Sequence, residues 1–294
     1  MNDIPRPEEI GSIRNLSLRA KLIVEGMIAG LHKSPFHGFS SEFLEYRPYL
    51  SGEPAGKIDW RKFAKTQKAV VRLFEDETNL KAHILIDKSA SMGFSSATLT
   101  KFEYARTLAA SIAWIFVRQK DAVGVAAFDE DLKTYIPPGS TNLQLKTILS
   151  HLESFQCGAS TRCARAIDQL AGSLKKRGMC IVISDLLDDT SEIIRGLRHL
   201  RFKRQDTIVL CVTDPMEQCF SGDSVRRMRD METGREITLD PAVAAQFFQD
   251  GIGAHYSKIS QSALDMGCDI EIIATTEPFQ KALLRVMEKR KCLF

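Results

Sequence analysis

The sequence lacks the features of a membrane-spanning, secreted or nucleic-acid-binding chain. No apolar run approaches the roughly 18 residues that a membrane-spanning helix needs. The start, MNDIPRPEE, has acidic residues where a signal peptide carries lysines and an apolar run. Forty basic and 37 acidic side chains give a net charge of only +3, so no strong field favours nucleic acid or an anionic membrane. We therefore expect a cytoplasmic protein that neither spans a membrane nor binds nucleic acid.

Cysteine pairing and common catalytic motifs are also missing. The seven cysteines are an odd number and form no Cys-x-x-Cys motif, a usage typical of reduced, buried thiols. Cys157 and Cys163 have no histidine nearby at the spacing of a zinc site. There is no nucleophile elbow, no phosphate-binding glycine loop and no His-Glu-x-x-His. These absences argue against structural zinc and against the common hydrolase classes.

What the chain does contain is a regular alternation of strand-like and helix-like segments. Short apolar runs typical of buried strands occur at residues 82–86, 122–128, 179–184, 207–213 and 269–274. Apolar residues with helical periodicity occur at residues 101–119, 143–152, 163–175, 191–200, 241–266 and 278–291. The alternation predicts an α/β fold with an open, mostly parallel, Rossmann-like sheet and helices on both faces.

Three segments depart from this alternation. Residues 9–31 have helical spacing and predict an N-terminal helix. Residues 33–66 are rich in Gly, Pro, Ser and aromatics, which predicts a loop-rich segment, and residues 225–239 predict a β-hairpin insertion. We expect two parts: residues 1–77, the N-terminal helix and loop-rich segment packed on the main domain, and residues 78–294, the main α/β domain.

Oxygen-bearing side chains follow the first predicted strand of the main domain. Asp87, Ser89 and Ser91 form an Asp-x-Ser-x-Ser directly after the run at residues 82–86. Because residues alternate sides in an extended loop, one carboxylate and two hydroxyls can point to the same place. Open α/β sheets bind ligands at the carboxyl ends of their strands. A hard cation such as Mg²⁺, which prefers oxygen ligands and keeps some of its waters, suits this set.

Two further residues should come close to this loop. Thr161 stands just before a predicted helix, and Asp185 stands just after a predicted strand. Simpler interpretations remain open for all of these side chains. Asp87 and Ser89 could cap the turn into the next helix, and Thr161 could be only a helix N-cap. Asp185 could be an ordinary acidic residue at a strand-end turn.

The five residues resemble the metal-ion-dependent adhesion site of von Willebrand factor A domains, where Asp-x-Ser-x-Ser, a threonine and a later aspartate surround one Mg²⁺ or Mn²⁺. The resemblance implies that Ser89, Ser91 and Thr161 contact the metal directly. It also implies that Asp87 and Asp185 support it largely through water. An acidic residue of a partner protein then completes the coordination sphere.

The chain departs from this pattern after the last aspartate. Many von Willebrand factor A domains have a glycine there, whereas this chain has Leu186. Asp188 or Asp189 could therefore share the role of Asp185.

A second resemblance covers the segment before the sheet. Residues 38–53, 57–61 and 71–75 are similar to the signature of bacterial domain-of-unknown-function family fifty-eight, with Glu53 and Lys57 replacing the more usual Asp and Arg. The resemblance extends over about residues 30 to 290. In that family the segment precedes a von Willebrand factor A-like domain. The genes often lie beside those of MoxR-type AAA+ ATPases, which implies such an ATPase, or its client, as the partner.

The sequence therefore predicts a non-catalytic adaptor or co-chaperone that binds an acidic residue of a partner through a magnesium site. A Mg²⁺-dependent hydrolase that uses the same metal site is the alternative. Asp59, Trp60 and Arg61 are a possible second contact with the partner. They could instead lock the loop-rich segment onto the sheet, because Trp60 offers a large apolar face and Arg61 an ion-pairing group.

Overall fold

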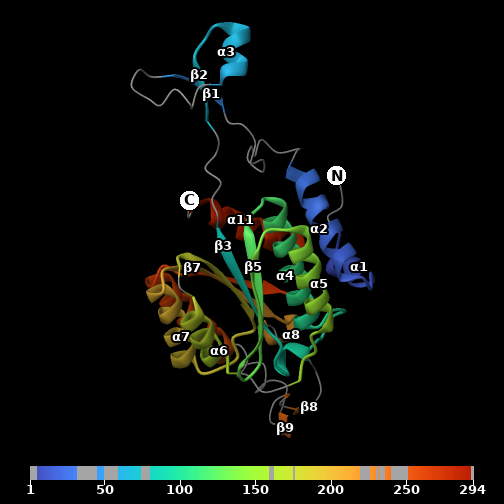
Figure 1. Ribbon diagram of the computed structural model, residues 1–294. Coiled ribbons are helices and arrows are strands. Elements are labelled where there is room, and N and C mark those ends of the chain that lie inside the picture. The colour runs from blue at the N-terminus through green and yellow to red at the C-terminus, as the bar shows by residue number, and fades with distance from the viewer. Residues whose placement is uncertain are drawn as a thin grey trace. The chain divides into compact units, whose positions relative to one another are not determined.

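The chain divides into two compact units. The computed structural model describes residues 5–31, 45–49, 59–73, 80–158, 162–174, 176–218, 226–229, 231, 236–239 and 251–292. Unit 1 comprises Met1–Pro35 and Leu80–Phe294, and unit 2 comprises Phe36–Asn79. Figure 1 shows the elements of both units.

Unit 1 is built on a six-stranded sheet. Its strands are β3 (Lys81–Asp87), β4 (Ala122–Phe128), β5 (Leu132–Gly139), β6 (Gly178–Ser184), β7 (Gln205–Thr213) and β10 (Asp269–Ala274). They lie in the order β10-β7-β6-β3-β4-β5, and every neighbouring pair is parallel except β4 with β5. Counted from β3, the order is 3-2-1-4-5-6, which reverses direction between β3 and β6. Ligands of open α/β sheets bind at such a switch point.

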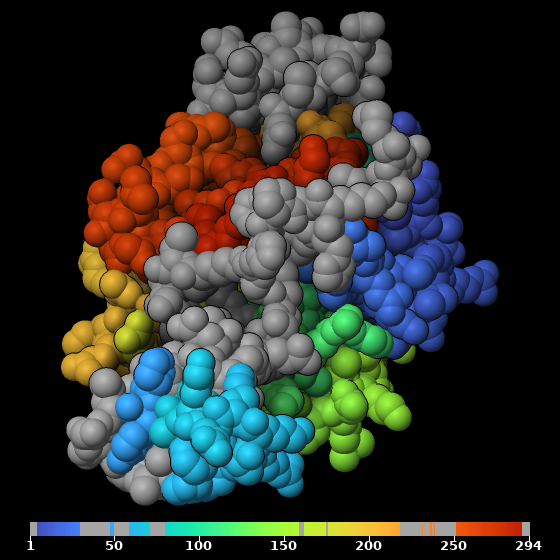
Figure 2. Space-filling view, turned by 90° about the horizontal axis from the view of Figure 1, so that it is seen from above, coloured from blue at the N-terminus to red at the C-terminus, as the bar shows by residue number. Residues whose placement is uncertain are grey.

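Helices cover both faces of this sheet. One layer contains α2 (Leu16–Leu31), α4 (Lys101–Arg118), α5 (Asn142–Ser154) and α11 (Phe279–Cys292). The other contains α6 (Cys163–Ser173), α7 (Thr190–Phe202) and α10 (Gly253–Asp265). In Figure 2, α2 (blue) and α11 (red) appear on the same face of the unit, consistent with their contact. The predicted α/β fold, with a mostly parallel sheet between two helical layers, is confirmed.

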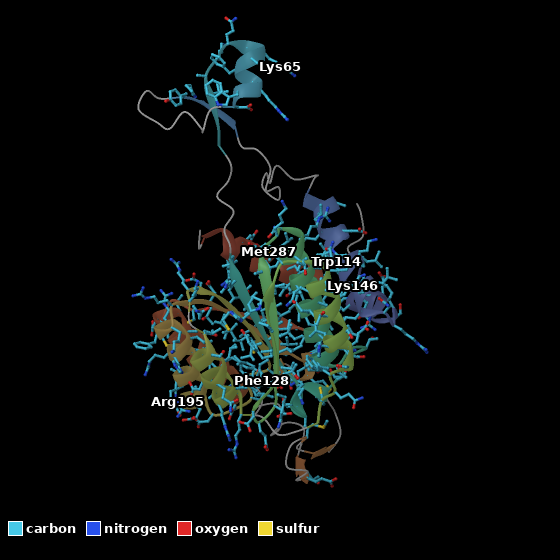
Figure 3. All side chains as sticks on the ribbon, in the orientation of Figure 1. Lys65, Trp114, Phe128, Lys146, Arg195 and Met287 are labelled. Carbon is cyan, nitrogen blue, oxygen red and sulfur yellow. The ribbon has the colours of Figure 1, made fainter. Side chains whose placement is uncertain are left out.

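The core lies between the sheet and these helices. On the side of α6, α7 and α10 it includes Leu85, Phe128, Val182 and Leu197, all of which are buried. Figure 3 shows Phe128 inside this packing and Arg195 on its outer surface. Of the described cysteines, Cys163, Cys180, Cys211 and Cys268 are buried free thiols and Cys157 is a half-buried one. Among the helices of the described residues, none is both long and apolar enough to cross a membrane.

In its described residues, unit 2 contains a two-stranded antiparallel sheet and the helix α3. Strand β1 (Glu45–Pro48) pairs antiparallel with β2 (Val70–Leu73), and α3 (Trp60–Thr66) lies between them in sequence. The Asp59 carboxylate caps α3 by accepting hydrogen bonds from the backbone N–H groups of Arg61 and Lys62.

Several elements differ from the sequence prediction. The single helix expected over residues 9–31 is two helices, α1 (Pro7–Gly11) and α2, because the Asn15 side chain accepts from the Leu18 N–H and starts a new helix. These helices belong to unit 1, where α2 packs on α4 and α11, although the predicted division grouped them with the loop-rich segment. Strand β5 was not predicted, since it contains Pro137 and Pro138, which an edge strand tolerates.

The C-terminal part follows the prediction where it is described. Strands β8 (Arg226–Arg229) and β9 (Glu236–Leu239) form the expected antiparallel hairpin. Of the helix predicted over residues 241–266, the part from Gly253 to Asp265 is α10, and residues 241–250 lie outside the described residues. Two further short helices, η2 (Ser91–Gly93) and α8 (Pro215–Gln218), follow β3 and β7.

Acid should destabilise unit 1 through His83. Burial, followed by the nearby charge of Lys81, lowers the pKa of this histidine to about 4. An unfolded histidine has a pKa of about 6.5, so between these values the unfolded state binds more protons and stability falls as the pH falls. Relative to His83→Gln, the wild type should lose about 3 kcal/mol of unfolding free energy between about pH 7 and about pH 4. Urea denaturation across that range measures the difference, and parallel curves for the two proteins would contradict it.

Candidate functional site

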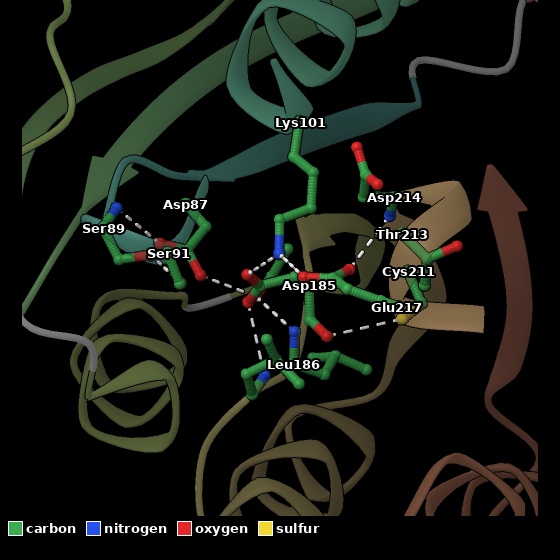
Figure 4. Close-up of polar contacts among 12 residues, drawn as sticks. Asp87, Ser89, Ser91, Lys101, Asp185, Leu186, Cys211, Thr213, Asp214 and Glu217 are labelled. Carbon is green, nitrogen blue, oxygen red and sulfur yellow. Dashed lines mark hydrogen bonds and ion pairs between the residues drawn. The ribbon is translucent and has the colours of Figure 1, made fainter. Parts of the chain in front are cut away.

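Four of the predicted metal-site residues, Asp87, Ser89, Ser91 and Asp185, lie at the switch point of the sheet. Asp87 ends β3 and Ser184 ends β6, and these strands are parallel neighbours with Ile86 opposite Ile183. Asp185 follows directly, so both strands deliver polar side chains to the same carboxyl edge (Figure 4). Asp87, Ser184 and Asp185 are fully buried. The structure thus brings together Asp87 and Asp185, which are 98 residues apart in the sequence.

Asp87 is held by neutral donors. Its Oδ1 accepts a hydrogen bond from the Ser89 N–H at 2.9 Å, and its Oδ2 accepts from the Ser184 hydroxyl at 2.6 Å. Burial, and then repulsion from the Asp185 carboxylate, raises the pKa of Asp87 above its ordinary value. A cation beside Asp87 would favour its ionised form. Each carboxylate oxygen keeps a second lone pair that can accept from water.

The two serines fit adjacent positions around a small cation. The hydroxyl oxygens of Ser89 and Ser91 are 3.0 Å apart. Adjacent ligands of an octahedral Mg²⁺, each about 2.1 Å from the metal, are separated by about 3.0 Å. Among the described residues, no three His, Cys, Asp or Glu side chains form a metal-binding group, so a cation here would depend on these hydroxyls. With Asp87 behind them, the serines fit a divalent cation.

Asp185 has a cation of its own. The ammonium of Lys101 lies 2.7 Å from Asp185 Oδ2 and 2.5 Å from Glu217 Oε1 (Figure 4). Burial alone would lower the pKa of Lys101, but the two carboxylates outweigh it and raise that pKa. The second oxygen of Asp185 accepts from the Leu187 N–H at 3.3 Å. Both oxygens of Asp185 therefore already have protein partners.

Strand alternation explains why the two aspartates differ. Cys180 and Val182 face the layer of α6 and α7, so Ser184 turns to the same side, where it bonds Asp87. Asp185 comes one residue later and turns to the opposite side, toward α4 and Lys101.

Sequence reasoning missed Lys101, Ser184 and Glu217. A signal for Lys101 was present, because it lies three residues before Tyr104 and seven before Leu108, on the apolar face of the predicted helix. A lysine on that face must find a buried partner. Neither the pairing with Asp185 nor that with Glu217 could be read from spacing, since the partners are 84 and 116 residues away.

The other acidic residues of this loop serve as helix caps. Asp188 Oδ2 accepts from the Cys163 N–H at 3.0 Å, at the start of α6. Asp189 is the N-cap of α7 and accepts from the N–H groups of Ser191 and Glu192. The N-cap of α4 is Thr100 with Glu103 in a capping box, so Asp87 and Ser89 do not cap that helix.

Thr161 lies outside the described residues. The chain on either side of it is anchored beside the Asp87 loop. The Gly158 N–H donates to the Lys88 carbonyl at 3.3 Å, and the Arg162 N–H donates to the Asp129 carbonyl at 3.2 Å. Asp129 itself pairs with the ammonium of Lys88 at 2.6 Å.

Leu186 has the backbone conformation that favours glycine. Its φ is +55°, in the left-handed region, and its N–H donates to the Ser184 hydroxyl at 3.0 Å. Its side chain is fully buried among the residues packed on α6 and α7. The leucine therefore keeps the left-handed turn that a glycine would adopt without strain.

Substitutions of Leu186 should separate strain from burial. Glycine would relieve about 1–2 kcal/mol of left-handed strain, whereas truncation of a buried leucine to alanine costs about 2–5 kcal/mol. We expect both variants to be less stable than the wild type, with Leu186→Ala the less stable of the two by about 1 kcal/mol because it keeps the strain. Urea denaturation gives the order, and Leu186→Gly falling below Leu186→Ala would reject this account.

Comparisons with known proteins agree with this architecture. The family described as Protein of unknown function DUF58 matches residues 45–252. An uncharacterized protein of Mycobacterium bovis is 28% identical over 298 residues, covering 98% of this chain and 92% of the relative. The structure of the conserved hypothetical protein BatB from Bacteroides thetaiotaomicron has a TM-score of 0.50 at 20% identity, and the match covers 72% of this chain and 99% of the BatB chain. The structure of an aerotolerance-related membrane protein from Bacteroides fragilis has a TM-score of 0.51 at 19% identity, and the match covers 71% of this chain and 98% of the other chain. The chain belongs to the DUF58 family, and unit 1 has a von Willebrand factor A-like fold.

Proposed function

We propose that unit 1 is a non-catalytic protein-binding module that holds one Mg²⁺ or Mn²⁺ and uses it to bind an acidic residue of a partner. The observation that carries this proposal is the pair of hydroxyls of Ser89 and Ser91, 3.0 Å apart at the end of β3. Asp87 lies beside them with only neutral hydrogen-bond donors among the described residues. The negative charge of its ionised form therefore calls for a cation at this position.

The proposed coordination sphere uses few charged ligands. Ser89 and Ser91 bind directly, and Asp87 acts through water because its oxygens already accept from Ser89 and Ser184. When bound, the metal would supply an electron-poor position that a partner carboxylate can complete. Thr161 is included because Gly158 and Arg162, on either side of it, are bonded to Lys88 and Asp129. Asp185 lies at the same edge of the sheet, where it pairs with Lys101.

The proposed partner is a MoxR-type AAA+ ATPase or its client, with the protein acting as an adaptor or co-chaperone in the cytoplasm. Unit 2 offers a second contact. Asp59 caps α3 and so fixes the start of the helix, where Trp60 is 57% exposed and stacks edge-on with Phe63. Arg61 is exposed beside it. An exposed Trp with a neighbouring Arg is typical of residues that dominate protein interfaces.

Metal binding should raise the melting temperature, because a ligand that binds only the folded state stabilises it by mass action. At 100 times the dissociation constant the gain is about 2.7 kcal/mol, a shift of roughly 5 °C or less for a chain of this size. The double variant Asp87→Ala with Ser89→Ala should lose the shift. Ser154→Ala, which removes a hydroxyl at the exposed end of α5, should keep it. An equal shift in the double variant would reject the site.

Partner capture should depend on the same metal. Affinity purification from the native bacterium should recover an AAA+ ATPase in magnesium, and EDTA should reduce the recovery at least tenfold. The Asp87 and Ser89 double variant should behave in magnesium as the wild type does in EDTA. Trp60→Ala should weaken capture without changing the magnesium dependence, since unit 2 would contact the partner without metal. Equal recovery in EDTA and magnesium would contradict metal-mediated binding.

A further inference from the structure

Lys101 is a buried lysine in an unfavourable place. It is the first residue of α4, directly after the N-cap Thr100, and its side chain is fully buried. Burial disfavours an ammonium, and so does the positive end of the helix dipole at this position. Two carboxylates compensate: Asp185 at 2.7 Å and Glu217 at 2.5 Å. The ammonium is therefore fixed between β6 and α8 by its charge.

The position of Glu217 is fixed in turn. Its second oxygen accepts from the Asp214 N–H at 2.9 Å. The Asp214 carboxylate accepts from the N–H and hydroxyl of Ser96, in the loop that follows the Asp-x-Ser-x-Ser. Lys101 thus sits in a network that joins the ends of β6 and β7 to the loop before α4. Asp185 and Glu217 cannot turn away from Lys101 without also losing their hydrogen bonds to the Leu187 and Asp214 N–H groups.

The two aspartates of the site have opposite charge balances. Asp185 is neutralised by Lys101, and its other oxygen accepts from Leu187. Within the described residues, the hydrogen-bond partners of Asp87 are groups of Ser89 and Ser184, all of them neutral. A divalent cation approaching Asp185 would meet the positive charge of Lys101, whereas one approaching Asp87 would meet a carboxylate without a counter-ion. The Lys101 ammonium therefore occupies the cation position beside Asp185, whereas the position beside Asp87 has no cation from the described residues.

We propose that Lys101 is a positioning residue that withholds Asp185 from the metal, so that, of the two aspartates, only Asp87 serves the cation beside Ser89 and Ser91. This inference rests on the proposed function and specifies its ligand set. Because Asp185 gives no charge to the metal, affinity at rest is low and a partner carboxylate becomes a required ligand. Lys101 also lets the carboxyl edge of the sheet fold without metal.

Binding of Mn²⁺ alone, followed through the electron paramagnetic resonance signal of the free ion, tests this inference. Asp185→Asn should bind Mn²⁺ within about twofold of the wild type, whereas Asp87→Asn should lose at least tenfold. Lys101→Met should bind at least tenfold more tightly, since it frees two carboxylates. Adding Asp185→Asn to Lys101→Met should remove most of that gain. Lys146→Met, which deletes an exposed lysine on α5, should leave the affinity unchanged.

The outcomes separate this inference from the proposed function. A tenfold loss in Asp185→Asn, or no gain in a folded Lys101→Met, overturns the role of Lys101 and leaves metal binding by the wild type standing. If neither the wild type nor Lys101→Met binds Mn²⁺, with or without an acidic peptide, the inference and the proposed function are both rejected. If Lys101→Met fails to fold, as circular dichroism would show, the Asp185→Asn and Asp87→Asn pair decides. Equal losses in that pair reject the inference, and loss in Asp87→Asn alone supports it.

Discussion

The carboxyl ends of β3, β6 and β7 must compensate four acidic side chains that are withdrawn from water. Asp87, Asp185 and Asp214 are fully buried and Glu217 is nearly so. An isolated buried carboxylate is costly, so each needs donors or a cation. The loop before α4, the turn after β6 and the short helix α8 supply those donors. The need to stabilise these carboxylates therefore accounts for much of the local structure at these strand ends.

The negative charges of these side chains are not balanced equally, and this difference distinguishes Asp87 from the others. Lys101 balances Asp185 and Glu217, while Ser96 and backbone groups hold Asp214. Asp87 receives hydrogen bonds but no counter-ion among the described residues. Breaking a buried ion pair by removing one partner usually costs about 3–5 kcal/mol, so the Lys101 network also holds α4 against the sheet.

Sequence periodicity predicted most of unit 1 because its central strands β3, β4, β6 and β7 are buried on both faces. Strand β4 has the predicted bounds, residues 122–128, since every residue in it is apolar or glycine. Strand β5 escaped prediction because Pro137 and Pro138 interrupt its apolar residues, and α3 escaped because its aromatics form no buried face. The strand order, which brings β3 beside β6, depends on tertiary pairing that no local pattern encodes.

Prediction of the site was limited in the same way. Asp87, Ser89, Ser91 and Asp185 were found because each stands at a predicted strand end. Their chemical states were not, because the Ser184 and Lys101 contacts arise only after folding. Leu186 shows a related limit: a leucine gives no sequence signal for a left-handed turn, yet it adopts one.

The antiparallel edge strand β5 bears on how copies of this chain can associate. Pro137 and Pro138 interrupt its ladder of N–H donors, and Gln144 binds the Pro137 carbonyl through its side-chain amide. An incoming strand would find no N–H donor at Pro137 or Pro138, and it would compete with Gln144 for the Pro137 carbonyl. Over those residues, β5 therefore resists intermolecular sheet extension and so protects the unit against strand-mediated aggregation along that edge.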